Sequence, residues 1–211
     1  MSDALIARFA AACAAIGCNA DVRDVGSAVV ASWSSAGRVY HDLSHLQASL
    51  ALFEEVRGHA QRPAEVEIAF FFHDAIYETR AVDNEARSAS WAREVLEGAG
   101  APAESVDRVE GAILATRLSA EPPTPDAALL VDLDRSILGA DAAVFDTYER
   151  GVREEYAWVE ESQYIAARMG VLERLAARTP LFKTAACARF EAPARANIAR
   201  SLASLRDIAS G

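Results

Sequence analysis

The sequence predicts an all-α fold, a multi-helix bundle formed by a single domain. Hydrophobic residues recur at steps of three and four along nearly the whole chain, which is the spacing of a helix face. Runs that alternate apolar and polar residues never reach five, and no Asn-Gly or Asp-Gly hairpin turn occurs, so strand signals are nearly absent. A chain of 211 residues with 52% hydrophobic residues fits a single globular domain.

The first three predicted helices cover 3–16, 25–36 and 43–57. Each carries an apolar stripe, weakest in the second. The stripes consist of Leu5, Phe9, Ala12 and Ile16, then Val25, Val29, Val30 and Trp33, then Leu43, Leu46, Leu50, Phe53 and Val56.

The next predicted helix, 63–77, begins with Pro63, a residue favoured in the first helical turn, and is apolar on almost every side. A helix without a polar face is expected at the centre of the fold. Asp83 is the predicted N-cap of the following helix, 84–98, which Gly98 and Gly100 bring to an end.

Pro102 opens a helix that runs to about Leu118, and the proline-rich segment 121–125 predicts a stiff extended connection. Glycine and proline residues mark the boundaries between the helices predicted for the rest of the chain. The remaining predicted helices are 126–138, 141–159, 161–178 and 186–208. Because no repeat or clear linker divides the chain, we expect one domain of eight to ten helices over 1–211.

Charge and cysteine content exclude several classes of function. The formal net charge of −10 argues against nucleic-acid polymers and anionic membranes as partners. Three irregularly spaced cysteines form no disulfide framework, and we interpret them as small core residues. Apolar stretches are too short for a membrane span, and the start of the chain lacks a basic region, so a cytoplasmic location is expected.

Ionisable residues in apolar surroundings are the features of the sequence that indicate a functional site. His73 and Asp74 follow the apolar run Ile68–Phe72 and should both be shielded from water. A buried carboxylate is costly unless it is paired or binds a metal ion. The structural alternative is that Asp74 pairs with a buried arginine and His73 is a hydrogen-bonded core residue.

A second signal is the pair His41 and His45, which are four residues apart. On a helix they would share a face and reach one ion, although His41 lies close to the predicted helix start. The alternative is two half-exposed histidines at a helix entry.

A third signal is the pair Asp132 and Asp134. The helical neighbours of Asp134 are all apolar, so we expect it to face the core and to be the better metal ligand. Asp132 has Arg135 and Ser136 as neighbours and is expected to pair locally.

Together, His45, His73, Asp74 and Asp134 form a set of mixed nitrogen and oxygen donors. Such a set suits Mn²⁺, Fe²⁺, Co²⁺, Ni²⁺ or Zn²⁺ better than Ca²⁺, and the lack of cysteine excludes a structural zinc site. Four protein ligands leave positions open for water and substrate, as a catalytic ion requires.

The order of these residues resembles the H…HD…D pattern of the HD superfamily of metal-dependent phosphohydrolases. Four segments resemble motifs of one subgroup, the predicted metal-dependent HD phosphohydrolases, namely YHNLxH, FHDAVY, DNExxSA and DxDLxILG. They are Tyr40–His45, Phe72–Tyr77, Asp83–Ala89 and Asp132–Gly139, and with the stretches 153–156 and 194–197 the similarity covers roughly 40–200.

The resemblance implies an HD-domain-like helical bundle with the ion between central helices. It also implies His45, His73, Asp74 and Asp134 as ligands, with His41 as a further ligand or phosphate-facing group and Asp132 as rival for the fourth position. Two departures stand out: Arg135 replaces an expected leucine, and the segment 116–119 lacks an expected histidine.

The function expected from this resemblance is hydrolysis of a phosphate ester or anhydride in a small phosphorylated substrate, with nucleotides among the candidates. Mg²⁺ is a further candidate for the bound ion. A homodimer is left open as the oligomeric state. Asp74 would orient the attacking water, Glu78 would reach it from one helical turn on, and Glu85, with Asn84 beside it, would act in acid/base chemistry. The candidate phosphate-facing cations are Arg87, Arg117, Arg135 and Arg153.

Two other functions remain open at this point. One is a non-catalytic helical module that binds metal or nucleotide for regulation. The other is a two-iron oxygenase of the HD type, which would need more histidine or aspartate ligands than the four identified; the chain has 4 histidines in total.

Overall fold

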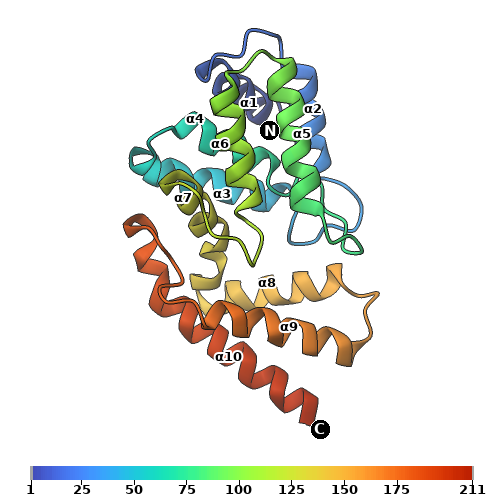
Figure 1. The fold of residues 1–211 in the computed structure, drawn as a ribbon. Coiled ribbons are helices and arrows are strands. Elements are labelled where there is room, and N and C mark those ends of the chain that lie inside the picture. The colour runs from blue at the N-terminus through green and yellow to red at the C-terminus, as the bar shows by residue number, and fades with distance from the viewer. Residues whose placement is uncertain (1, 211) are drawn as a thin grey trace. The chain divides into compact units, whose positions relative to one another are not determined.

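The computed structural model describes residues 2–210 (Figure 1). This part of the chain holds ten α-helices and three 3₁₀ helices and contains no strand, which confirms the all-α prediction. The contacts divide the chain into two compact units, Met1–Val131 and Asp132–Gly211. Each unit is described by itself below, and the single-domain organisation stays a prediction.

The first unit is built from six complete helices and most of a seventh (Figure 1). Their bounds are α1 Ser2–Ala15, α2 Arg23–Ser32, α3 Leu43–Val56, α4 Pro63–Phe72, α5 Asn84–Gly98, α6 Ala103–Leu114 and α7 Pro125–Asp134, with the 3₁₀ turn η1 Arg57–His59 after α3.

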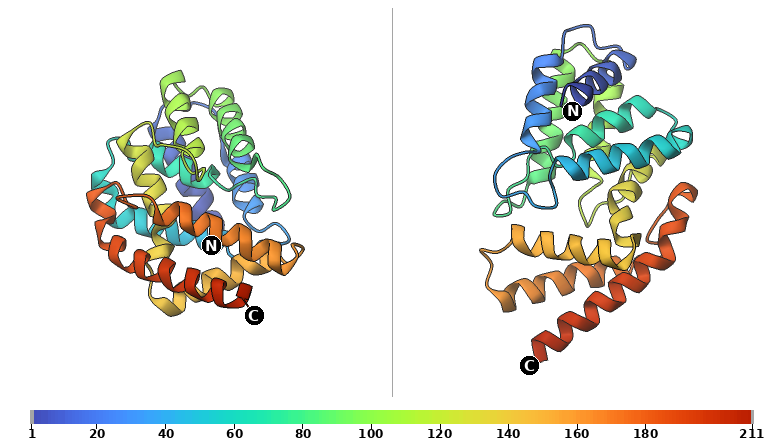
Figure 2. Two further views of the ribbon diagram at one scale, coloured as in Figure 1. Left: turned by 60° about the horizontal axis from the view of Figure 1, so that its bottom comes forward. Right: turned by 180° about the vertical axis from the view of Figure 1, so that it is seen from behind.

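Helix α4 is the centre of this unit, as its apolar sequence predicts. It packs against α1, α2, α3, α5 and α6, and α5 and α6 pack along each other (Figure 2). Ile68 and Phe70–Phe72 are fully buried. Phe9 of α1 lies edge-on to both Phe71 and Phe72, with ring centroids 5.3 and 5.8 Å apart. Aromatic pairs of this geometry add to the gain from burying their area.

Two carboxylates of α4 are buried, and arginines from other helices neutralise them. Glu65 accepts two hydrogen bonds of 2.7 Å from Arg108 of α6. Glu67 pairs with Arg8 of α1 and with Arg57 at 2.8 Å. These pairs remove the cost of an unpaired buried charge, so α4 keeps an interior position despite two acidic residues.

The second unit contains three α-helices and two 3₁₀ segments. They are η2 Arg135–Gly139, α8 Ala142–Glu155, α9 Glu161–Ala176, η3 Ala185–Phe190 and α10 Glu191–Ser210. Helix α10 packs along α9 and against both 3₁₀ segments (Figures 1 and 2). Its buried Asn197 donates to the carbonyl groups of Leu138 and Ala140, which fixes the end of η2.

Most predicted helices are confirmed within a few residues, and the clearest errors concern helix ends. Helix α4 ends at Phe72 and not at residue 77, and His73–Ala75 form a turn. The predicted helix 126–138 changes to 3₁₀ geometry after Asp134, and the predicted 186–208 begins as the 3₁₀ segment η3. Asp83 stands at the N-cap position of α5, but its side chain makes no capping hydrogen bond.

A search of the described residues for a helix both long and apolar enough to cross a lipid bilayer finds none.

The packing around α4 predicts the effect of removing one aromatic ring. Phe9→Ala deletes a fully buried ring that contacts Phe71 and Phe72, so we expect a loss of about 3–5 kcal/mol in unfolding free energy. Equilibrium urea denaturation measures it. Val82, which is 100% exposed, provides the control, since Val82→Ala should change stability by less than about 0.5 kcal/mol. Equal effects for both variants would contradict the packing.

Candidate metal centre

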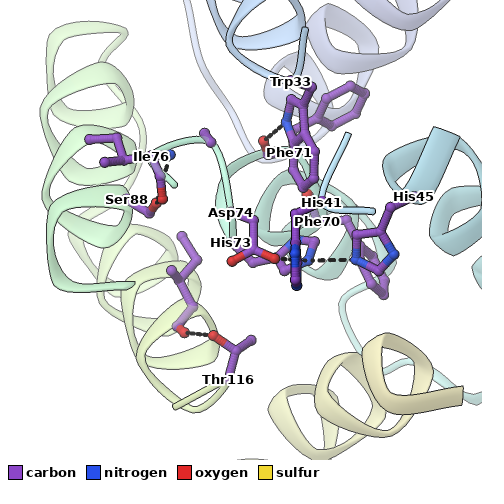
Figure 3. A network of polar contacts seen from close by, with 12 residues as sticks. Trp33, His41, His45, Phe70, Phe71, His73, Asp74, Ile76, Ser88 and Thr116 are labelled. Atoms are coloured by element: carbon purple, nitrogen blue, oxygen red, sulfur yellow. Dashed lines mark hydrogen bonds and ion pairs between the residues drawn. The ribbon is translucent and has the colours of Figure 1, made fainter. Parts of the chain in front are cut away.

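Three of the predicted ligands meet in the first unit, at the ends of two neighbouring helices. His45 lies in the first turn of α3, and His73 and Asp74 lie in the turn that follows α4. The Nε2 atoms of His45 and His73 are 3.3 Å apart, and His73 Nε2 is 3.4 Å from Asp74 Oδ2 (Figure 3). Donor atoms of all three side chains lie within 4.8 Å of one another, which makes them a group that could hold a metal ion.

The start of α3 places His45. Asp42 is the N-cap, and its carboxylate accepts hydrogen bonds from the backbone N–H groups of Ser44 and His45, at 2.8 and 3.3 Å. An aspartate at this position satisfies N–H groups that have no partner within the helix. This cap therefore fixes the backbone at His45, and the His45 side chain is buried.

One hydrogen bond determines which ring nitrogen of His73 can bind an ion. Its Nδ1 lies 2.9 Å from the carbonyl oxygen of Phe70. Because a carbonyl oxygen only accepts, Nδ1 carries a proton and donates it, so Nε2, which faces His45 and Asp74, is the nitrogen that can bind an ion. Metal-binding histidines are commonly oriented by such a bond from the second ring nitrogen.

The distances between donor atoms fit coordination of one divalent ion. Two ligands about 2.1 Å from an ion lie about 3.0 Å apart at a right angle and about 3.4 Å apart at the tetrahedral angle. The separations of 3.3 and 3.4 Å around His73 Nε2 fall in this range. Two imidazole nitrogens and a carboxylate oxygen are donors that suit divalent transition metals, so the residues fit the predicted ion.

Aromatic rings enclose the two histidines. The ring centroid of Trp33 lies 5.2 Å from that of His73, and its Nε1 donates to the carbonyl oxygen of Phe71 at 2.9 Å. Tyr40 covers His45, with ring centroids 4.9 Å apart. His73 is 1% exposed, whereas the Asp74 side chain is 17% exposed. Solvent therefore reaches the group through Asp74.

Arg38 connects the two ligand-bearing segments, and the sequence analysis missed it. Its guanidinium donates to the carbonyl oxygens of His41, Asp74 and Ala75 at 2.7, 2.8 and 2.9 Å. It also lies 5.4 Å from the ring centroids of both Trp33 and Tyr77. An arginine two residues before a Tyr-His pair was the available signal, but nothing in its spacing indicates contact with residues 74 and 75.

His41 is not part of the metal-binding group. It precedes the N-cap of α3, so the expectation that His41 and His45 share a helix face is wrong. Its ring stacks on Tyr77, with centroids 4.3 Å apart and an angle of 25° between the planes. The distance between the ring centroids of His41 and His45 is 6.0 Å.

Glu78 does not occupy the predicted position either. Because α4 ends at Phe72, the argument that Glu78 lies one helical turn beyond Asp74 is wrong. Its exposed carboxylate pairs with Arg87 at 2.8 Å, and hydrogen bonding to Arg87 holds the pKa of Glu78 below its usual range. This ion pair directs Glu78 toward solvent.

The start of α5 fixes the chain that follows the ligands. Asn84 accepts from the N–H of Glu78 and donates to its carbonyl oxygen, at 3.1 and 2.9 Å. Buried Ser88 accepts from the N–H of Ile76 at 3.0 Å (Figure 3). Asn84 thus positions the backbone. The side chain of Glu85, half-buried beside it, makes no hydrogen bond or ion pair with the residues that the structure describes.

The two candidate aspartates of α7 differ from the prediction in burial. Asp132 is the buried one, at 1% exposure, so the expectation that it pairs locally at the surface is wrong, while Asp134 is half-buried. Asp132 accepts from the N–H of Lys183 at 3.1 Å and from the N–H and hydroxyl of Thr184, both at 2.7 Å. With both oxygens engaged inside the second unit, Asp132 has a structural role.

The four arginines proposed to face a phosphate differ in their contacts. Arg87 pairs with Glu78, Arg153 donates to the carbonyl oxygens of Tyr156 and Val159, and Arg135 is buried. The side chain of Arg117, half-buried just after α6, makes no hydrogen bond or ion pair within the described part of the chain.

Comparison with family models, with curated proteins and with solved structures finds no match to this chain.

The Arg38 contacts predict that this side chain sets metal affinity without contacting the ion. Arg38→Lys keeps the positive charge but loses the planar fork that bonds three carbonyl groups, so we expect 10–100-fold weaker Co²⁺ binding by the apoprotein, roughly the effect of losing an outer-shell partner. Arg23, an exposed arginine, provides the control variant Arg23→Lys. Unchanged affinity in Arg38→Lys, with helix content retained by circular dichroism, would contradict the positioning role.

The two aspartates of α7 should respond differently to substitution. Asp132→Ala leaves the N–H groups of Lys183 and Thr184 without their partner, so we expect a loss of about 1–3 kcal/mol in unfolding free energy. Asp134→Ala should lower metal affinity, because Asp134 is the fourth ligand that the sequence predicts. Thermal unfolding and metal titration of both variants measure this. The opposite pattern would assign Asp132 to the metal.

Proposed function

We propose that this chain is a metal-dependent phosphohydrolase of the HD type that acts on a phosphate ester or anhydride. The observation that carries the proposal is the convergence of His45, His73 and Asp74 on one small volume, in the order of the HD pattern. Asp134, the last residue of α7, is proposed as the fourth ligand from the sequence pattern alone, and the engagement of Asp132 in other hydrogen bonds supports that choice.

The bound ion would supply a water molecule of lowered pKa and would polarise the phosphoryl oxygen. The residues of the chain would position the ligands, exclude water and orient the attacking water molecule. His45 and His73 are buried, and their contacts with Trp33 and Tyr40 fix the rings and exclude water from behind the site. Asp74 is the ligand that solvent reaches, so its carboxylate can accept a hydrogen bond from the attacking water and orient it.

Two further residues are proposed for the open side of the first unit. The carboxylate of Glu85 has no partner among the described residues and stays the candidate for proton transfer. The side chain of Arg117 likewise has no partner there and is the proposed cation for the substrate phosphate. We propose no catalytic role for Glu78, because its ion pair with Arg87 occupies it.

The structure gives no support to a two-iron oxygenase. Such a site needs additional histidine or carboxylate ligands, and two histidines remain outside the group. His59 is exposed on η1, and His41 stacks on Tyr77. The non-catalytic module is retained as an outcome of the experiment below.

The proposal predicts matched losses of metal and activity. Elemental analysis and a panel of phosphate esters and nucleotides, assayed with Mn²⁺, Co²⁺, Ni²⁺ or Mg²⁺, compare wild type with Asp74→Ala, His73→Ala and the control His59→Ala. We expect stoichiometric metal and hydrolysis in wild type and in His59→Ala, and loss of both in the other two variants.

Two results would contradict the proposal in different ways. Metal binding, or tight nucleotide binding, without turnover of any substrate would favour the regulatory module. Absence of metal in wild type after reconstitution would refute the ligand assignment, and Asp74 would then be one member of a buried polar network.

A further inference from the structure

The end of α1 carries a feature that the proposed function does not use. The N–H of Cys18 donates to the carbonyl oxygen of Cys13 at 3.1 Å, and the N–H of Gly17 donates to that of Ala14 at 3.0 Å. Gly17 has a φ of 97°, a left-handed conformation that glycine adopts without strain. These two hydrogen bonds and the left-handed residue define a Schellman turn, in which Cys13 is the C3 residue and Cys18 the C″ residue.

A Schellman turn brings the side chains at these two positions together. They usually form an apolar contact that closes the helix end. Here both are cysteines, five residues apart, and the backbone of Cys18 is hydrogen-bonded to that of Cys13. The backbone of the turn therefore places the two cysteines next to each other.

The surroundings fix this turn in place and leave one of its two cysteines partly exposed to solvent. The next residue, Asn19, donates its N–H to the carbonyl oxygen of Ala99 at 2.9 Å, which anchors the turn to the α5–α6 connection. Cys13 is completely buried, whereas Cys18 is half-buried. A reagent in solution therefore reaches the sulfur of Cys18 first. Cys187, the remaining cysteine, is buried in the second unit.

We propose that Cys13 and Cys18 form a dithiol modification site, which a small disulfide in solution converts reversibly to an intramolecular disulfide bond. The thiolate of Cys18 attacks the external disulfide, forms a mixed disulfide and releases one thiol. The thiolate of Cys13 then attacks the sulfur of Cys18 and releases the second thiol. The two cysteines lose two electrons and two protons, and the external disulfide is reduced to two thiols.

The environment also sets the pace of this exchange. Burial raises the pKa of both thiols, so little thiolate is present at neutral pH. The exchange should accelerate as pH rises toward these raised values, because the thiolate is the nucleophile. The pair should therefore react slowly with disulfides and respond to a sustained oxidising condition, whereas a cysteine of low pKa reacts rapidly.

The test treats reduced, folded protein with oxidised glutathione at pH 7–9, quenches with acid, alkylates and maps the products by mass spectrometry. Wild type should lose the thiols of Cys13 and Cys18 together as one disulfide that dithiothreitol reverses, while Cys187 stays unmodified. Cys13→Ala should stop at a mixed disulfide on Cys18, because the resolving thiol is absent. Cys18→Ala should resist modification, since only buried thiols remain.

Three results would overturn the proposal. Wild type that accumulates a stable mixed disulfide on Cys18 would show that Cys13 cannot reach it, and wild type that stays fully reduced would show that the turn does not present a reactive pair. Oxidation of Cys187 at the same rate as the pair would show reaction through unfolding. Circular dichroism before quenching confirms that each variant is folded, and because the readout involves no metal or substrate, it is independent of the proposed hydrolase activity.

Discussion

The hydrogen bond from His73 Nδ1 to the carbonyl oxygen of Phe70 is the contact on which the candidate site depends. It engages Nδ1 of a buried imidazole and leaves Nε2 facing a second imidazole nitrogen 3.3 Å away. Two nitrogen lone pairs repel each other at that distance unless a proton or a cation lies between them. A divalent cation bound by both rings would fill this position, and its binding would displace a proton held there.

The early end of α4 creates the geometry around this bond. After Phe72 the chain leaves the helix, and the carbonyl groups of the turn need other partners. Arg38 donates to the carbonyl oxygens of Asp74 and Ala75 and brings the segment before α3 against the turn. Asn84 and Ser88 hold the chain beyond it. The motif residues that frame the ligands therefore serve mainly to hold the backbone of the turn in place.

Much of this arrangement was predictable from the sequence, and the misses have physical causes. The apolar run Ile68–Phe72 correctly predicted a central helix, because burial on all sides requires apolar residues on all sides. The same run could not show where the helix ends, since the stop depends on contacts with Arg38 and Ser88, which are distant in sequence. The prediction for Glu78 assumed that the helix continued and was wrong for that reason.

The aspartates of α7 show a second limit of sequence reasoning. Apolar neighbours at helical spacing indicate a buried face, but they cannot reveal that Lys183 and Thr184 supply hydrogen-bond donors to Asp132. A carboxylate that appeared able to pair on the surface is in fact the buried one. Grouping His45, His73 and Asp74 succeeded because each lies beside an apolar segment, where an ionisable side chain needs a specific partner.

The most direct test of the central claim is the X-ray absorption spectrum of the protein loaded with one equivalent of Co²⁺ or Zn²⁺. The account predicts a first shell of nitrogen and oxygen donors without sulfur, with scattering from two imidazole rings, in wild type and no retained ion in His73→Ala. A first shell without imidazole scattering, or the same spectrum in both proteins, would contradict it, because His45 and His73 would then not share an ion.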